Sequence, residues 1–165
     1  MRVLGIDPSL KSTGFGIIEG EENNYSVLEY GCIKAARKLP FHQKINNIRF
    51  KIEEIIHTFK PDEIAIENPF YAQNIKTALI LGQVRGAILV AVADNRLPLF
   101  EYSALEIKKS VTGYGQADKN QVRYMVSTLL KIEENNLEMD ASDALATAFC
   151  HLNSRLFQKK IDTEC

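Results

Sequence analysis

Four acidic residues stand where the surrounding sequence would bury or orient a carboxylate instead of leaving it in solvent. Asp7 and Glu67 each end a short apolar run, and Asp140 and Asp143 belong to a segment of mostly small residues near the C-terminus. Burying carboxylates is costly unless a positive charge compensates them. A divalent metal ion is the obvious partner, so the four residues together predict a metal site.

The spacing and type of these residues indicate which metal they would hold. Asp140 and Asp143 are three positions apart, so on an α-helix they are separated by about 60° around the axis and about 4.5 Å along it. They can share one cation, and oxygen ligands without His or Cys favour Mg²⁺ or Mn²⁺ over zinc. His151 lies near the same helical stripe but about 16 Å further along, which is too far to bind that ion.

Each acid also has an ordinary structural explanation when it is considered alone. Asp7 precedes Pro8 and could form a turn, Asp140 could cap a helix, and Asp143 could lie on the surface. The small and apolar neighbours of Asp143, however, predict a closely packed helix face, where an isolated charge is unfavourable. We therefore favour one shared site for all four residues.

The overall composition is that of a single globular domain. The chain has 165 residues, of which 45% are hydrophobic and 25% are charged, and these values are typical of soluble proteins. Its three cysteines are odd in number and lack a CxxC spacing, which argues against a disulfide framework or a zinc site. Too few apolar residues precede Asp7 for a signal peptide, so we expect a cytoplasmic protein.

The formal net charge of −1 gives no reason to expect nucleic-acid binding, but basic residues are segregated along the chain. One group lies between residues 34 and 51, where there is no acidic residue, and a second flanks a glycine-bearing loop. The members are Lys34, Arg37, Lys38, Lys44, Arg49 and Lys51 in the first group, and Lys108, Lys109, Lys119 and Arg123 in the second. For the first group, a solvated face and a nucleic-acid surface are equally open. The second is the better candidate because of its loop.

The hydrophobic pattern predicts the elements that position these residues. The expected strands are residues 2–7, 13–19, 25–35, 62–67 and 97–101, and the expected helices are residues 41–59, 78–93, 118–130 and 139–156. The first three strands form an antiparallel meander, and the fourth follows a helical crossover, so it runs parallel to one of them. This is an α/β layer fold. Asp7 and Glu67 then end parallel strands, at the edge where open sheets bind their ligands.

We expect one domain of residues 1–156 and a short C-terminal tail of residues 157–165. Asp118 is the expected N-cap of the helix that ends near Leu130, with Gln121 as its capping-box partner.

The most apolar segment, residues 78–93, is interrupted by polar residues such as Arg85 and is shorter than the roughly 20 residues that cross a membrane. We therefore expect a buried helix and no membrane association. Ala78, Gly82 and Gly86 recur every four residues along it and permit close backbone approach. This stripe could seat the helix on the sheet or form a two-fold contact between subunits, and both interpretations are open.

Five segments closely resemble the bacterial RuvC Holliday junction resolvases. They are residues 4–16, 65–70, 81–86, 113–119 and 140–148, in the order and at the spacing of that family. The resemblance extends from residue 2 to about residue 153 and implies an RNase H-like α/β fold, with a mixed five-stranded sheet and helices on both faces. Ser9 stands where the family commonly has glycine, which affects only the conformation of the first loop.

The same resemblance implies roles for individual residues. The four carboxylates would be the catalytic residues and would bind two Mg²⁺ ions per active site, which Mn²⁺ could replace. Phe70 would stack on a base at the junction, and Lys108 and Lys119 would bind DNA near the scissile backbone. Lys119 would also offset charge that develops on the phosphate. Taken without the resemblance, Phe70 would pack on its own domain and Lys119 would be a solvated lysine.

The resemblance further implies a homodimer that nicks two strands of like polarity at four-way junction DNA and leaves 5′-phosphate and 3′-hydroxyl ends, in recombination and DNA repair. Association with the RuvA–RuvB branch-migration complex is implied in the same way. Three other interpretations are an actin-like ATPase or sugar kinase, an RNase H-like nuclease that acts on ribosomal RNA precursors, and a junction-binding scaffold without catalysis. The chain is too short for a two-domain kinase, and the presence of all four acids argues against a scaffold.

Overall fold

The computed structural model describes residues 1–21, 24–68 and 74–164. Its elements are, in chain order, β1 (Arg2–Asp7), β2 (Ser12–Glu21), β3 (Asn24–Lys34), α1 (Phe41–Phe59), β4 (Glu63–Asn68), α2 (Ile75–Asp94), β5 (Leu99–Ser103), α3 (Ala104–Thr112), α4 (Lys119–Leu130), the 3-10 turn η1 (Glu134–Asn136) and α5 (Met139–Glu164). Asp118 caps α4, and both hydrogen bonds of its capping box with Gln121 are present. This prediction is confirmed.

The five strands form one mixed sheet in the order β3-β2-β1-β4-β5. The strands β1, β2 and β3 pair antiparallel, whereas β1, β4 and β5 pair parallel. The predicted meander and the parallel fourth strand are therefore both confirmed. Because Ile6 is in register with Ile66, the strand ends that carry Asp7 and Glu67 lie at the same level on neighbouring strands.

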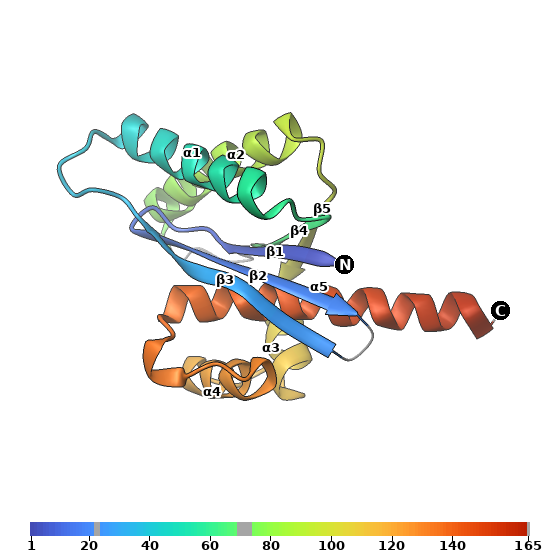
Figure 1. Ribbon diagram of the computed structural model, residues 1–165. Coiled ribbons are helices and arrows are strands. Elements are labelled where there is room, and N and C mark those ends of the chain that lie inside the picture. The colour runs from blue at the N-terminus through green and yellow to red at the C-terminus, as the bar shows by residue number, and fades with distance from the viewer. Residues whose placement is uncertain (22–23, 69–73, 165) are drawn as a thin grey trace.

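Helices cover both faces of the sheet, as expected. Helices α1 and α2 lie on one face, and α5 lies on the other, with α3 and α4 packed outside it (Figure 1). The alternation of side chains along each strand explains the two layers. Leu4 and Ile6 of β1 belong to the apolar core that contains α1 and α2, whereas Val3 and Ala65 belong to the core that contains α5.

The prediction that the most apolar helix is buried is wrong. Of the residues in α2, only Val84, Ile88, Ala91 and Val92 are buried, while Ile75 is 82% exposed and Leu79 is 64% exposed. A Cβ built on Gly82 or on Gly86 meets nothing within 4 Å. The glycine stripe therefore faces away from the sheet, and it does not seat the helix on it. Apolar composition alone therefore does not show which face of a helix is buried in the single chain.

Helix α2 is also longer than expected, and its 20 residues are long and apolar enough to cross a membrane by composition alone. Its contacts belong to a folded domain, however. Val84 and Ile88 pack into the core between the sheet and α1, and Arg85 donates hydrogen bonds to the carbonyl oxygen of Glu67 and to the carboxylate of Glu101.

Helix α5 runs further than the sequence pattern predicts, since it continues to Glu164 instead of ending at Leu156. It projects beyond the ends of β2 and β3 (Figure 1). The division between a domain of residues 1–156 and a tail of residues 157–165 stays a prediction, although no break in the helix marks it. The helix begins at Met139, so Asp140 lies in its first turn and is not the N-cap.

Candidate active site

The alternation along β1 and β4 decides which way the two strand-end carboxylates face. In β1, Val3 packs against α5 while Leu4 and Ile6 pack on the opposite face, so Asp7 shares the α5 face. In β4, Ala65 likewise belongs to the core with α5, and this places Glu67 on that face as well. The two carboxylates therefore lie side by side, beneath the start of α5.

Two glycines let the first turns of α5 approach the sheet closely. A Cβ on Gly14 would lie 1.9 Å from the carbonyl oxygen of Asp140, and a Cβ on Gly5 would lie 2.1 Å from the carbonyl oxygen of Ala144. Both distances are impossible for a real Cβ, so only glycine permits this packing. Gly14 is also the register partner of Asp7. The backbone of Asp140 is thus laid directly on β2, beside Asp7.

The four carboxylates lie close enough to perturb one another. Burial, followed by the negative charges of Glu67, Asp143 and Asp140, raises the pKa of Asp7 to about 8. Burial and the charge of Asp143 also raise the pKa of Glu67, and burial raises the pKa of Asp143. The strands β1 and β4 and the helix α5 thus place the four acids near one another, and their common role as a site stays a prediction.

Lys119 is the nearest cation to this acidic cluster. It is the first residue of α4, and its Nζ atom lies 2.9 Å from Oδ2 of Asp143. Its positive charge opposes, but does not cancel, the rise in the pKa values of Asp7 and Glu67. The hydrogen bond to Asp143 raises the pKa of Lys119 itself. The side chain of Lys119 is 65% exposed, while that of Asp143 is only 16% exposed. Lys119 can therefore turn from Asp143 towards a ligand in solvent.

Lys108 lies on the same side of the cluster. A pocket of about 160 Å³ opens beside the acids, and its polar lining residues are Glu67, Lys108, Lys119 and Asp143. Its floor is apolar and comes from α3 and α4, through Ala104, Ile107 and Val122. The positive charge of Lys108 lowers the pKa of Glu67. Both predicted DNA-binding lysines therefore border the acidic cluster.

The donor set fits a hard divalent cation. It consists of carboxylate oxygens alone, with Lys108 and Lys119 beside four acids, and such sets select Mg²⁺ or Mn²⁺. Among residues 1–21, 24–68 and 74–164, no three carboxylate, imidazole or thiolate groups are gathered tightly enough to enclose an ion. In this arrangement Asp143 takes Lys119 as its counter-ion. A bound cation would replace that partner.

Arg85 was overlooked as a site residue by sequence reasoning. Its Nη1 atom donates to the carbonyl oxygen of Glu67 at 2.7 Å, and its Nη2 atom donates to Oε1 of Glu101 at 2.6 Å. The side chain of Arg85 is only 13% exposed. It therefore anchors the end of β4 where the carboxylate of Glu67 emerges. The available signal was an arginine within an otherwise apolar helix, because a buried cation needs partners.

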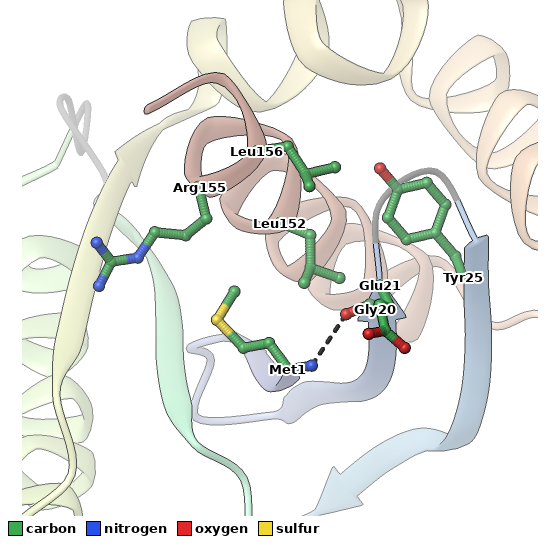
Figure 2. A pocket seen from close by; sticks show the side chains of 7 residues that line it. All are labelled: Met1, Gly20, Glu21, Tyr25, Leu152, Arg155 and Leu156. Atoms are coloured by element: carbon green, nitrogen blue, oxygen red, sulfur yellow. Dashed lines mark hydrogen bonds between the residues drawn. The ribbon is translucent and has the colours of Figure 1, made fainter. Parts of the chain in front are cut away.

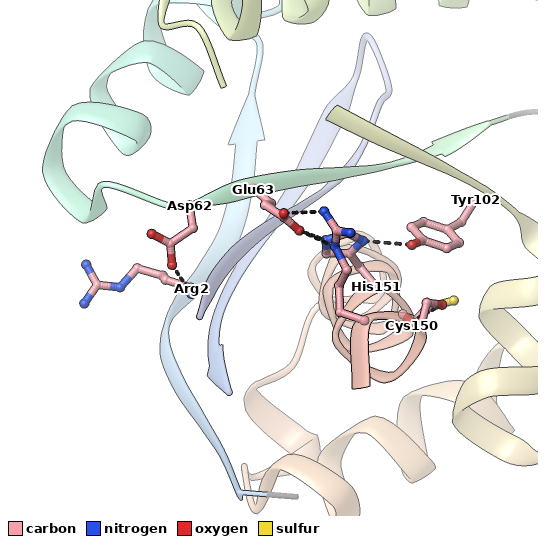
Figure 3. Close-up of polar contacts among 8 residues, drawn as sticks. Arg2, Asp62, Glu63, Tyr102, Cys150 and His151 are labelled. Atoms are coloured by element: carbon pink, nitrogen blue, oxygen red, sulfur yellow. Dashed lines mark hydrogen bonds and ion pairs between the residues drawn. The ribbon is translucent and has the colours of Figure 1, made fainter. Parts of the chain in front are cut away.

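One residue singled out in the sequence, His151, lies away from the cluster. Phe70 falls outside the described residues. His151, as expected, does not reach the acids: it is fully buried near the other end of β4, where Nε2 contacts Oε2 of Glu63 at 2.5 Å and Nδ1 contacts the hydroxyl of Tyr102 at 2.8 Å (Figure 3). Arg155 also donates to Glu63. This network ties α5 to the sheet.

A second pocket, of about 320 Å³, lies at that far end of the sheet (Figure 2). It is lined by Met1, Gly20, Glu21, Tyr25, Leu152, Arg155 and Leu156. The amino group of Met1, at the start of β1, donates to the carbonyl oxygen of Gly20, whereas Asp7 ends β1. Of the predicted site residues that the structure describes, none borders this pocket.

Comparisons with known proteins point in one direction. The family model described as "Crossover junction endodeoxyribonuclease RuvC" matches residues 3–151. A relative of that name from Petrotoga mobilis is 39% identical over 155 residues, covering 94% of this chain and 95% of its own length. Another, from Halothermothrix orenii, is 40% identical over 164 residues and covers 99% of both chains. A third, from Geotalea uraniireducens, is 45% identical over 154 residues, or 93% of this chain and 90% of the relative.

Solved structures agree with the sequence comparison. The structure of T. thermophilus RuvC in complex with a Holliday junction substrate matches with a TM-score of 0.90 and 28% identity, and the match covers 96% of each chain. Another structure of Thermus thermophilus RuvC gives a TM-score of 0.84 and 29% identity, covering 94% of this chain and 96% of that one. These matches confirm the expected RNase H-like fold. With its acidic cluster at the carboxyl ends of β1 and β4, and with full-length relatives near 40% identity, this chain belongs to the RuvC family of crossover junction endodeoxyribonucleases.

Proposed function

We propose that the protein is a structure-selective endonuclease that resolves Holliday junctions. In this proposal it makes symmetric, metal-dependent nicks in two strands of like polarity and leaves 5′-phosphate and 3′-hydroxyl ends. The observation that carries the proposal is the convergence of Asp7, Glu67, Asp140 and Asp143 beside Lys119. The solved T. thermophilus RuvC complex contains a Holliday junction substrate, which supports the choice of substrate.

The four carboxylates would hold Mg²⁺, two ions per site, with Mn²⁺ as a substitute. The bound metal supplies an activated water and charge stabilisation at the attacking and leaving oxygens. The backbone of Asp140 is held against β2 by close packing at Gly14, which would keep the start of α5, and with it this carboxylate, next to Asp7.

The lysines would act on the phosphate. Lys119 pairs with Asp143 in the free protein, and its largely exposed side chain would turn its Nζ atom to the scissile phosphate. There it offsets the negative charge that develops in the transition state. Lys108, across the same pocket, would hold the backbone in place. Phe70 would stack on an unpaired junction base, a contact worth roughly 1 to 3 kcal/mol.

Two strands require two active sites in one particle, so we also propose a homodimer. The exposed apolar face of α2 supports it, because Ile75 and Leu79 are left in solvent and Gly82 and Gly86 leave room for a second backbone. A two-fold contact between such faces is self-complementary. Cytoplasmic location and association with the RuvA–RuvB complex are parts of the same proposal that rest on family membership.

The test is to incubate the protein with Mg²⁺ and a synthetic mobile four-way junction, next to matched linear duplex and a four-way RNA of the same shape. We expect paired nicks at symmetric positions in the DNA junction only, which DNA ligase then seals because the ends are 5′-phosphate and 3′-hydroxyl. Asp7→Asn should abolish the nicks while junction binding persists. Glu54→Gln, which removes a carboxylate from an exposed ion pair on α1, is the matched control and should cut normally.

Each component of the proposal has its own contrary outcome. If the wild-type protein cuts no strand, the nuclease proposal fails. If it cuts the RNA as well as the DNA junction, the substrate is a structured nucleic acid of either kind. Single, unpaired nicks would contradict the dimeric mechanism, and nicks that ligase cannot seal would contradict the predicted ends.

A further inference from the structure

The basic run between residues 34 and 51 divides into two groups in the folded protein. On α1, Arg49 forms ion pairs with Glu53 at 2.7 Å and with Asp94 at 3.1 Å, and Lys51 pairs with Glu54 at 2.6 Å. These two cations are therefore neutralised by local partners. For this half of the run, the interpretation as a solvated face holds.

The other half lines a groove. Lys34, Arg37 and Lys44 meet Lys11 and Ser12 around a cavity of about 650 Å³, and none of the described residues that border it is acidic. We call this the basic groove. Lys34 pairs with Glu138 at 2.6 Å, so its charge is partly compensated. Within the part of the chain that the structure describes, Lys11, Arg37 and Lys44 form no ion pair, and the groove therefore carries uncompensated positive charge.

The basic groove lies at the same edge of the sheet as the acidic cluster. Ser12 begins β2 and is in register with Lys34 at the end of β3, while Asp7 ends β1 beside Gly14. The partner of Lys34, Glu138, stands two positions before Asp140 in the chain. The groove therefore adjoins the acids on the side of β2 and β3.

Cations thus flank the acidic cluster on two sides. Lys108 and Lys119 border it on the side of α3 and α4, and the basic groove borders it on the side of β3 and the start of α1. A polyanion with one phosphate at the carboxylates would extend past both groups. A single small ligand could not touch both.

We infer that the basic groove binds the phosphate backbone of a DNA arm as that arm leaves the cleavage site. This inference rests on the proposed function and adds a second contact surface to it. The described residues that line the groove offer three cations without an ion pair and a hydroxyl but no aromatic ring, so the groove would hold backbone phosphates and read no bases. Its role is to fix the direction of one arm relative to the scissile bond.

The experiment measures junction binding against salt concentration. Each phosphate that a lysine or arginine neutralises adds about 0.9 to the steepness of log K against log salt. Arg37→Ala and Lys44→Ala should each lower the steepness by about 0.9, and the double variant by about 1.8. Lys51→Ala removes the same charge from the paired half of the run and should leave the slope unchanged. Arg37→Lys keeps the charge and should keep the wild-type slope.

Binding is measured by fluorescence anisotropy in EDTA, so the result does not depend on cleavage. Suppose that the double variant keeps the wild-type slope of log K against log salt while Lys108→Ala lowers it. The inference that DNA binds in the basic groove would then be wrong, and the proposed function would stand. A wild-type protein that binds junction and duplex equally would instead contradict the proposed function. Because Lys44 is half-buried, Lys11→Ala, at an exposed position of the same groove, provides a second test should Lys44→Ala fail to fold.

A separate measurement tests whether the basic groove contacts a DNA arm. As the junction arms are shortened stepwise, the affinities of the wild type and the double variant should converge, because a short arm no longer reaches the groove. If the difference persists for the shortest arms that still form a junction, Arg37 and Lys44 contact the crossover itself, and the assignment to an arm is wrong.

Discussion

At the scale of single residues, the raised pKa of Asp7 makes the stability of the metal-free protein depend on pH. Burial and three neighbouring acids raise the pKa of Asp7 to about 8, from its ordinary value of 3.8. Between these values the folded protein binds more protons than the unfolded chain. The free energy of unfolding must therefore fall as the pH rises from about 4 to about 8.

Asp7→Asn removes this dependence, because asparagine carries no charge at any pH. In EDTA, the free energy of unfolding in urea should rise on substitution by on the order of a few kcal/mol more at pH 8.5 than at pH 5, because only the wild type loses stability as the pH rises. Adding Mg²⁺ at pH 8.5 should reduce the difference in unfolding free energy between the variant and the wild type, because the ion stabilises only the protein that keeps Asp7. An equal effect of the substitution at both pH values would show that the folded protein does not raise the pKa of Asp7.

At the scale of elements, the acidic cluster depends on how closely α5 lies on β2. Gly14→Ala would place a Cβ 1.9 Å from the carbonyl oxygen of Asp140, and the first turn of α5 would have to move. We expect a loss of at least about 1 to 3 kcal/mol in urea unfolding, together with loss of junction nicking. Gly31→Ala is the matched control in β3, because its Cβ would meet only the ring of Phe15, at 3.2 Å. Equal losses in the two variants would contradict the close packing of α5.

The elements also show what the sequence could and could not predict. Alternation and strand ends were enough to bring Asp7 and Glu67 together, since both features are local to the chain. The anchoring of Glu67 by Arg85 was missed, because it joins residues that only the crossover between β4 and α2 brings into contact. The burial of α2 was predicted wrongly for a related reason. An apolar composition is typical of a helix in the core and of a helix at an interface, so it does not distinguish the two.

At the scale of the whole molecule, the exposed face of α2 predicts how the particle assembles. Leu79→Glu puts a charge on that face, where Leu79 is 64% exposed in the single chain. If two such faces pack together, the charge would be buried without a partner. We expect a folded monomer in sedimentation at concentrations where the wild type sediments as the proposed dimer, and single unpaired nicks in place of symmetric pairs. Tyr124→Glu, at a position of α4 that is 58% exposed, should leave the dimer intact. A dimeric Leu79→Glu variant would move the two-fold contact away from α2, and the open space at Gly82 and Gly86 would then require another occupant.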